Sequence, residues 1–479
     1  MNFYSQVLSR EEQERVHKQS LRILNEVGVR FHGKKAIPIL EKNGAKVDRE
    51  QKIARIPAEL VEQALTTTPK SFVLGARNPD HDFPMPSSVT RYCIDGTAAF
   101  AIDFHTGERR YGVTKDTENG LRVFQQMDLG VMAWAPTTAS DKPSGSRALH
   151  EFFAMIKYSS KHGQHELHTV AQVPYLVEGL KAVLGSEDEV KACKNYSLIY
   201  CPVAPLSHDG EMLDAYLELG EFELPVMVMP MPVCGTTGPA SLFSNVCLAN
   251  AENLSALVVY QLAHPGRWVI YSSATGIVDF SSGGYRGGMV EMGIMSAALI
   301  AMGRFYGMPS TAAGCTSDAR EPGPQAILEK IMTTIPPVLA GADIVIGTGE
   351  IESDQALVLE QLVVDNEIGH NCQRLVEGVN TGEDKDLIDE IIQVGHGGHF
   401  LKSRNTRAAA RSGEFYLSRL IPNDPYEAWI RVNKPNLYTN ARERVNEILA
   451  APLTDPLPGN ILSKLDDILK TADLGLEDG

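Results

Sequence analysis

The chain has few cysteines, and their arrangement is typical of neither zinc binding nor disulfide bonding. Seven cysteines, an odd number, are scattered through 479 residues, and no Cys-x-x-Cys motif occurs. Zinc ribbons need closely spaced cysteines, and small secreted disulfide proteins carry dense, even-numbered sets. The cysteine pattern therefore favours a reduced, cytoplasmic setting.

Positive charge is also scarce. The 44 lysines and arginines are outnumbered by 60 aspartates and glutamates, which gives a formal net charge of −16. Nucleic acids and anionic membranes are bound through clusters of lysine and arginine, so neither is expected as a partner. The amino-terminal stretch MNFYSQVLSREEQERVH is too charged for a signal peptide, and no apolar run approaches the ~18 residues of a membrane span. We expect a soluble cytoplasmic protein.

A dinucleotide-binding motif is the third absence. No Gly-x-Gly-x-x-Gly follows the first predicted strand, which removes the best support for an open doubly wound sheet. From about residue 116, short apolar runs alternate instead with helical segments such as Phe243–Leu262 and Val290–Phe305. Seven such repeats in roughly 250 residues are typical of parallel strands joined by crossover helices. The apolar runs are 131–134, 167–170, 197–200, 225–229, 268–271, 309–312 and 343–346.

This alternation favours an α/β fold, a TIM-type (β/α)8 barrel whose eighth strand comes from the region before residue 131. Residues 1–115 are predicted to form an amino-terminal cap of helices and a small antiparallel β element, which includes Tyr92–Phe104. Residues 116–375 then form the barrel. Residues 376–479, polar and punctuated by prolines, are predicted to be a carboxy-terminal helical wrap around it.

In such barrels the active site lies in the loops that follow the strands. Four loops at predicted strand ends are rich in glycine, serine, threonine and carboxylates: 234–239, 272–273, 314–320 and 347–353. For each loop taken alone, turn formation is a sufficient explanation of this composition. Because all four lie at the same end of successive strands, they predict a common pocket.

The histidine-rich stretch His162–His168 suggests a metal site, and Asp318 could complete it in a metal-assisted barrel hydrolase. On a strand, however, His165 and His168 point to opposite faces because side chains alternate. No His-Glu-x-x-His helix is present either. We therefore expect no metal in this chain.

Aromatic residues in or just after the predicted strands are candidates for binding a cationic ligand. Aromatic ring faces attract quaternary ammonium groups, although each ring alone is better explained as core. The candidates are Trp134, Tyr200, Tyr271 and Tyr285.

Several motifs resemble those of the trimethylamine:corrinoid methyltransferase family. They extend through nearly the whole chain, and the block 339–368 is specific. The matching stretches are Thr106–Arg109, Gly235–Ala240, Asn250–Leu254, Leu339–Ile344, Gly349–Ser353, Glu360–Ile368 and Asp424–Trp429. The resemblance implies a TIM-type barrel that moves a methyl group from an amine to the cobalt of a partner corrinoid protein.

The resemblance also bears on the substrate. The founding trimethylamine enzymes of this family carry pyrrolysine in the segment that matches Thr316–Gln325, where this chain has only standard residues. The chain therefore resembles the non-pyrrolysine branch, and most of all the glycine betaine:corrinoid methyltransferases. Methyl transfer to cob(I)alamin is an in-line displacement, in which a quaternary ammonium leaves as a neutral tertiary amine, whereas trimethylamine needs prior activation. Glycine betaine is thus the expected donor, with carnitine, proline betaine and choline as alternatives.

The same resemblance gives the strand-end loops their expected roles. A carboxylate or an aromatic face would hold the cationic nitrogen, and a cationic or N–H-rich group would hold the betaine carboxylate. Asp318, Arg320 and Glu352 are the predicted catalytic residues. The predicted substrate-binding residues are Thr237, Ser273, Gln325, Glu350, Tyr271 and Trp134.

The cofactor is expected on another protein. The Asp-x-His-x-x-Gly pattern typical of base-off corrinoid domains does not occur. We therefore expect cob(I)alamin or methylcobalamin on a cognate corrinoid protein that docks at the barrel mouth, and no metal or nucleotide in this chain. A homo-oligomer is expected because cytoplasmic barrels often pair through their outer helices. Alternatives from other classes are the metal-assisted hydrolase and a non-catalytic betaine-binding or corrinoid-docking protein.

Overall fold

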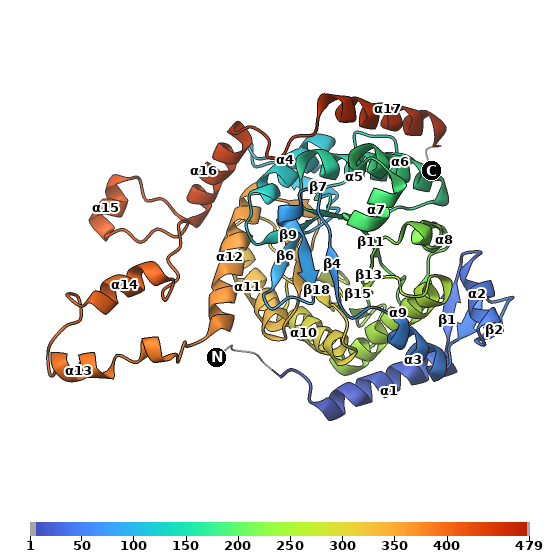
Figure 1. Cartoon of the computed structure of the whole chain (residues 1–479), viewed down its shortest axis with the longest axis horizontal. Helices are drawn as coiled ribbons and strands as arrows, with labels where there is room; N and C mark the ends of the chain where they lie inside the picture. The colour runs from blue at the N-terminus through green and yellow to red at the C-terminus, as the bar shows by residue number, and fades with distance from the viewer. Residues whose placement is uncertain (1–5, 477–479) are drawn as a thin grey trace.

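Eight short parallel strands form a closed barrel at the centre of the molecule (Figure 1). The computed structural model describes residues 6–476. Around the barrel the strands follow the order β15-β13-β11-β10-β9-β6-β19-β18. Backbone bonds close it between β15 and β18: the Tyr271 amide donates to the Pro309 carbonyl at 3.0 Å, and the Ala313 amide to the Ser273 carbonyl at 2.8 Å. The barrel strands are β6 Arg91–Ile94, β9 Gly130–Ala133, β10 His162–His165, β11 Tyr196–Tyr200, β13 Val226–Val228, β15 Val269–Tyr271, β18 Thr311–Ala313 and β19 Ile344–Thr348.

Each barrel strand is followed by a helix, as a (β/α)8 barrel requires, and the predicted fold class is confirmed. A further short helix, α7 (Glu187–Cys193), lies between α6 and β11. In strand order from β6, the helices that follow the barrel strands are α4 Thr114–Gln125, α5 Arg147–Tyr158, α6 Val173–Leu184, α8 Gly210–Glu218, α9 Leu242–Ala263, α10 Val290–Phe305, α11 Pro324–Leu339 and α12 Leu359–Glu377.

Helix α9 is the one helix in residues 6–476 that is long and apolar enough to cross a membrane. Most of it is buried, because α1 (Arg10–Glu26) and α3 (Ala58–Thr67) pack on its outer side. It also contains Asn250, Glu252 and Asn253, all buried. These contacts identify α9 as a core helix that the amino-terminal cap covers.

The first barrel strand comes from the region before residue 131, as predicted, but from a segment that the sequence assigned to the cap. Tyr92–Phe104 was expected in the antiparallel element of the cap, but β6 pairs in parallel with β9 and β19. Tyr92, Cys93 and Ile94 are all buried, as in a parallel strand covered on both faces. Only the second half of the segment is antiparallel, as β7 (Phe100–Ile102) with β8 (Arg109–Tyr111). The barrel therefore begins before residue 116, while the division into three domains stays a prediction.

The strand expected at 167–170 is also displaced. The structure places β10 at His162–His165, a stretch with polar side chains that the search for apolar runs overlooked. Inside the barrel, His162 Nε2 lies 2.9 Å from Ser197 Oγ, which in turn donates to Gln164 Oε1 at 3.3 Å. These hydrogen bonds allow a polar strand in the core, and they leave Gln164 Nε2 buried without a partner.

The amino-terminal cap covers one side of the barrel. Helix α1 starts at the capping box that Ser9 forms with Glu12. A four-stranded sheet in the order β12-β1-β3-β2 and the hairpin β4–β5 complete it. Its other elements are β1 Val29–Phe31, α2 Ala36–Lys42, β2 Lys46–Asp48, β3 Ile53–Arg55, β4 Phe72–Leu74, β5 Phe83–Met85 and β12 Ser207–His208.

Two small sheets grow out of the loops at the carboxyl ends of the barrel strands. The first joins β14 (Val233–Cys234), β16 (Gly276–Val278) and β17 (Tyr285–Arg286). The second joins β20 (Glu350–Ile351) and β21 (Ala356–Leu357) to β7 and β8. Both sheets belong to segments that follow barrel strands, so they rim the mouth of the barrel.

The carboxy-terminal region only partly forms the predicted wrap. Helices α16 (Leu437–Ala450) and α17 (Gly459–Gly475) pack on the barrel helices, as Figure 1 shows. Before them, residues 379–434 leave the body as an extension, here called the arm. It contains α13 Ile388–Val394, α14 Arg404–Ser412 and α15 Tyr426–Arg431.

Candidate active site at the barrel mouth

Three carboxylates meet at the ends of β6 and β19. Asp95 directly follows β6, and its backbone amide donates to the Thr348 carbonyl at the end of β19, at 3.0 Å. Glu350 begins β20, two residues beyond that point, and Asp354 lies in the β20–β21 hairpin. Neighbouring parallel strands thus bring their carboxyl-end acids to one place, as is usual for barrel active sites.

These acids are buried without enough hydrogen-bond donors. Both carboxylate oxygens of Glu350, which is fully buried, and Oδ1 of Asp354 have no hydrogen-bond partner. Burial raises the pKa of Asp95 to about 6. Burial and the charge of Asp95 raise the pKa of both Glu350 and Asp354 well above the ordinary range. A buried unpaired carboxylate is costly, so a cationic ligand would be bound strongly here.

Asp95 and Asp354 influence each other's pKa. Burial raises the pKa of both carboxyls, and their mutual interaction raises the pKa of Asp354 further. Like-charged carboxyls in contact cannot both ionise easily, which makes the pair titrate as a unit. The arrangement leaves the free protein with less negative charge at the mouth than three carboxylates would give.

Two aromatic rings border the carboxylates. Trp134 is buried against Gly96, where an added Cβ would lie 2.7 Å from the indole ring, and its Nε1 has no partner. Tyr285 packs in the same way on Gly276 and also has an unpartnered hydroxyl. Burial, followed by the charges of Asp354 and other acids, raises the pKa of Tyr285, so the phenol shares the surroundings of these acids.

Unpartnered hydroxyls lie at the end of β15. The side-chain oxygens of Ser273 and Thr275 are buried and lack hydrogen-bond partners. Thr275 immediately precedes Gly276, on which Tyr285 packs. The mouth therefore combines unpaired acids and aromatic rings with unused donors, a set that suits a ligand with both a cationic and an anionic end.

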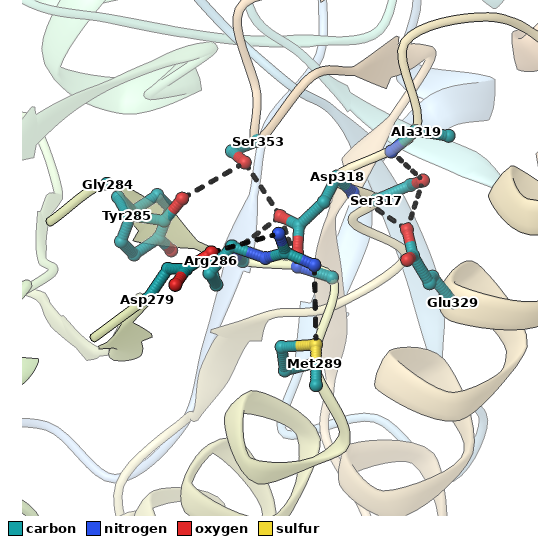
Figure 2. A network of polar contacts seen from close by, with 12 residues as sticks. Asp279, Gly284, Tyr285, Arg286, Met289, Ser317, Asp318, Ala319, Glu329 and Ser353 are labelled. Atoms are coloured by element: carbon teal, nitrogen blue, oxygen red, sulfur yellow. Dashed lines mark hydrogen bonds and ion pairs between the residues drawn. The ribbon is translucent and has the colours of Figure 1, made fainter. Parts of the chain in front are cut away.

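Asp318 is fully engaged within the protein (Figure 2). Its Oδ2 accepts from Arg286 Nε at 2.7 Å, and its Oδ1 accepts from the amides of Gly287 and Gly288 at 2.9 Å and from Ser353 Oγ at 2.7 Å. Glu329 anchors the same loop by accepting from the Asp318 amide at 2.8 Å. Asp318 thus ties together the loops after β15, β18 and β19, which is a positioning role.

The hairpin tip next to Asp318 has an unusual backbone. Glu352, Ser353 and Asp354 are consecutive residues with φ of 60°, 57° and 66°. Each such left-handed conformation costs on the order of 1–3 kcal/mol for a non-glycine residue and persists only when its surroundings impose it. Here Ser353 N–H donates to Ser317 O at 2.7 Å, and Arg109 Nε donates to Glu352 Oε2 at 2.8 Å. These hydrogen bonds stabilise the strained backbone next to Asp354, which is part of the acid cluster.

A buried ion pair supports the turn beneath Glu350. Lys330 on α11 and Asp365 on α12 are both fully buried, 2.9 Å apart. Lys330 Nζ also donates to the Gly347 carbonyl at 3.1 Å, and Asp365 Oδ2 accepts from the Gly349 amide at 2.7 Å. The pair therefore fixes the backbone that leads from β19 into Glu350.

The structure brings only some of the predicted site residues together. Trp134, Ser273 and Glu350 lie at the mouth, and Asp318 and Glu352 lie in the loop network beside it. Tyr271 is buried in the barrel wall, where its hydroxyl donates to Asn250 Oδ1 at 2.8 Å.

Three predicted residues lie away from the acid cluster. Arg320 is exposed and lines a cleft of about 800 Å³ bounded by α16. Gln325 is exposed and donates to Glu329 Oε1 at 2.9 Å. Thr237 is exposed, and its hydroxyl accepts from the Val233 amide at 2.9 Å. None of the three joins the unpartnered groups at the mouth: Thr237 and Arg320 lie in the loops before α9 and α11, and Gln325 lies in the first turn of α11.

Sequence reasoning missed Asp95 and Asp354 and named Tyr285 only as one of four aromatic candidates for a cationic ligand. The rule that active-site residues follow barrel strands would have found Asp95, had Tyr92–Ile94 been taken as the first strand. Asp354 lies one residue beyond the predicted strand-end loop 347–353. The sequence contains acidic residues at these positions, but they could be assigned to the site only if the position of β6 were known.

The candidate metal ligands His165, His168 and Asp318 do not form a common site. His165 Nε2 contacts Glu151 Oε2 at 3.1 Å, His168 is exposed, and Asp318 is engaged as described. In residues 6–476, no group of three or more histidine, cysteine, aspartate or glutamate side chains is arranged to hold a metal ion. The hydrolase alternative has no site in this part of the chain.

Comparisons with known proteins give one consistent result. The family model described as trimethylamine methyltransferase (MTTB) matches residues 3–474. Trimethylamine methyltransferase MttB of Methanosarcina thermophila is 30% identical over 470 residues, covering 96% of each chain. Glycine betaine methyltransferase of Desulfitobacterium hafniense (strain Y51) is 29% identical over 465 residues, covering 96% of this chain and 95% of that protein. A solved structure of Methanosarcina barkeri monomethylamine methyltransferase (MtmB) shares the fold, with a TM-score of 0.50 at 12% identity over 93% of this chain and 89% of that one.

Proposed function

The chain belongs to the trimethylamine methyltransferase (MTTB) family, and from this premise we propose that it transfers a methyl group from glycine betaine to cob(I)alamin on a partner corrinoid protein. The products are dimethylglycine and methylcobalamin. The family moves methyl groups from methylated amines to corrinoid proteins; the choice of glycine betaine is our proposal. The relative named glycine betaine methyltransferase supports it, as does the absence of any non-standard residue in 316–325.

The observation that carries the proposal is the cluster of buried acids at the mouth, in which both oxygens of Glu350 and Oδ1 of Asp354 are unpaired and Asp95 lies beside them. A quaternary ammonium cannot donate a hydrogen bond, so it needs only charge and apolar contact. Unpaired carboxylates supply the charge, and the faces of Trp134 and Tyr285 suit the methyl groups. The oxygens that the protein leaves unbonded are thus those that such a cation would neutralise.

The anionic end of the donor needs hydrogen-bond donors. We assign this role to Ser273 and Thr275, with the Trp134 indole N–H as a further donor, because all three are buried without partners. A carboxylate that accepts two or three such bonds is oriented as well as bound. This assignment replaces Arg320, which lies on the outer cleft.

The chemistry requires little of the protein beyond positioning. The reduced cobalt of the docked carrier supplies the electron pair that forms the new bond to the methyl carbon. The C–N bond breaks and its electron pair stays on nitrogen, so a neutral tertiary amine leaves and no proton is transferred. Holding the N–CH3 bond in line with the mouth is therefore the main catalytic contribution. Reduced cobalt requires a reducing compartment, which agrees with a cytoplasmic location and with seven unpaired cysteines.

The test is anaerobic methyl transfer followed by visible spectroscopy. The purified chain is mixed with cob(I)alamin, free or on its carrier, and glycine betaine, and methylcobalamin formation is measured. Carnitine, proline betaine, choline and trimethylamine are compared at equal concentration. We expect glycine betaine to react fastest. Preference for another quaternary amine would replace the substrate, and no methylation by any of them would overturn the enzymatic proposal, leaving a binding protein.

A further inference from the structure

The arm, residues 379–434, exposes far more apolar surface than the rest of the molecule. It contributes thirteen of the twenty-seven large apolar side chains that are exposed in residues 6–476. None of its helices, α13, α14 and α15, contains a buried residue. Monomeric soluble proteins rarely expose apolar groups at this density, so the arm has the features of an uncovered interface.

The helices of the arm are too short to be stable alone. They span 7, 9 and 6 residues, whereas isolated helices shorter than about 12–15 residues are marginal in water. On α13, Ile388, Ile391 and Ile392 share one face at helical spacing and are 58%, 53% and 72% exposed. Leu401, at the turn toward α14, is 78% exposed. This apolar face needs a protein surface to pack on.

Contacts with the body hold only the root of the arm. Tyr416 donates to Glu367 Oε2 on α12 at 2.9 Å, and Leu420 O accepts from Asn440 Nδ2 on α16 at 2.7 Å. The outer part, with α13 and α14, lies away from the barrel in Figure 1. The fold therefore presents the apolar face without covering it.

Charge on the arm is segregated into two halves of opposite sign. Residues 379–394 carry five carboxylates and one lysine, and residues 402–411 carry four cations and no carboxylate. Arg404, Arg407 and Arg411 follow one face of α14 and form no ion pair within residues 6–476. Asp389 is likewise exposed with no ion pair in that range.

We propose that the arm is an interface between two copies of this chain, in which α13 of one copy packs against α14 of the other and the reverse. A two-fold pairing brings the same patch together twice, so an acidic and a basic half on one patch become complementary to each other. The isoleucines of α13 supply the apolar centre, and the charges fix the antiparallel direction. This proposal does not depend on the methyl-transfer reaction.

The first test measures the molar mass of the full chain by light scattering and sedimentation velocity. We expect an even multiple of 52.3 kDa. The double variant Ile388→Asp/Ile392→Asp should halve that mass while circular dichroism and thermal unfolding of the body stay unchanged. Leu474→Asp, at a still more exposed apolar position outside the arm, is the control and should leave the mass unchanged.

The second test reverses the charges. Arg407→Glu alone should weaken assembly at least tenfold at low salt, and combining it with Asp389→Arg should restore assembly. A monomeric wild-type chain, or an oligomer that both the isoleucine and the charge variants leave intact, would overturn the proposal. If the chain is monomeric and the isoleucine variant instead loses binding to the corrinoid protein, the arm binds that partner and our assignment is wrong. Methyl-transfer assays on each variant separate these outcomes from a failure of the enzyme.

Discussion

The barrel mouth and the arm differ in how they leave groups unsatisfied. At the mouth single buried atoms lack hydrogen-bond partners, among them both carboxylate oxygens of Glu350 and the hydroxyls of Ser273 and Thr275. In the arm whole helix faces are uncovered, and none of α13, α14 or α15 buries a residue. Single unpaired polar atoms in a densely packed site can be satisfied by a small ligand. A continuous exposed apolar surface is instead buried by another protein.

The two regions also differ in what holds them in shape. The mouth is braced from below by Lys330 and Asp365 and from the side by Asp318, all within the chain. The arm has contacts to the body only at its root. We therefore expect substitutions at the mouth to change stability or catalysis of each subunit, and substitutions in the arm to change assembly alone.

The largest expected effect is on stability, at the support of the mouth. Lys330→Met leaves Asp365 charged and buried without its partner, which typically costs about 3–5 kcal/mol. The double variant Lys330→Met/Asp365→Leu removes both charges and should recover most of that loss. Urea unfolding of the purified variants measures both values. Equal destabilisation in the single and double variants would show that the charge pair is not what supports this turn.

The next effect is on catalysis. Asp95→Asn keeps the size of the side chain but removes the charge that a quaternary ammonium would contact. We expect kcat/KM for glycine betaine to fall by about 10²–10³, mainly through KM, because nitrogen loses its charge as the methyl group leaves. Steady-state methylcobalamin formation measures this. Ile388→Asp in the arm is the comparison, and its kcat/KM per subunit should equal that of the wild type.

A smaller effect is a pH dependence of the affinity for glycine betaine at the mouth. Asp95, with a pKa of about 6, and the higher-titrating Asp354 and Glu350 become charged as the pH rises. A cation prefers the charged form, so glycine betaine should bind up to about tenfold more tightly per pH unit while one proton is released, and level off above the cluster's pKa values. Calorimetry in buffers of different ionisation enthalpy measures the affinity and the number of protons released. Affinity that is constant with pH would exclude these acids from the site.

The same groups should affect stability with the opposite sign. Their pKa values are raised in the folded chain, so the folded state binds more protons than the unfolded state above pH ~4. The free energy of unfolding without ligand should therefore fall as the pH rises through about 6, and Asp95→Asn should reduce that fall.

The smallest effect belongs to the arm. Ala409→Gly on α14 should weaken that helix by about 1 kcal/mol. Because the helix buries nothing in the subunit, the loss should appear as faster hydrogen exchange of the amides of 404–412 and slightly weaker assembly, with the barrel unchanged. Slower exchange of these amides at high protein concentration would sharpen the comparison by showing that a second copy covers them. A lowered unfolding temperature of the barrel would instead show that the arm supports the body.

The alternation of apolar runs and helices was enough to predict the barrel, because strands covered on both faces and amphipathic crossover helices have distinct periods. It failed at β6, where the turn-forming pair Asp95-Gly96 directly follows the strand and favours a hairpin, and at β10, where polar side chains bond to one another inside the barrel. The predicted mouth therefore included Glu350 and lacked Asp95, and the role of Glu350 stays a prediction. Which residues near a strand end face inward, as Trp134 does and Arg320 does not, depends on tertiary contacts that no local pattern contains.

The path of the arm along α12 has a consequence for anyone who wishes to shorten this protein. The chain leaves at Glu377, the end of α12, but α16 returns beside its start, where Tyr438 donates to Gln361 Oε1 at 2.8 Å. A 19-residue helix is about 28 Å long, so a replacement linker needs at least about eight extended residues. A shorter splice would pull α16 off α12 and open the cleft that holds Arg320. The arm therefore also connects the end of the barrel opposite the mouth, where α12 ends, to the mouth, where α12 begins and α16 packs.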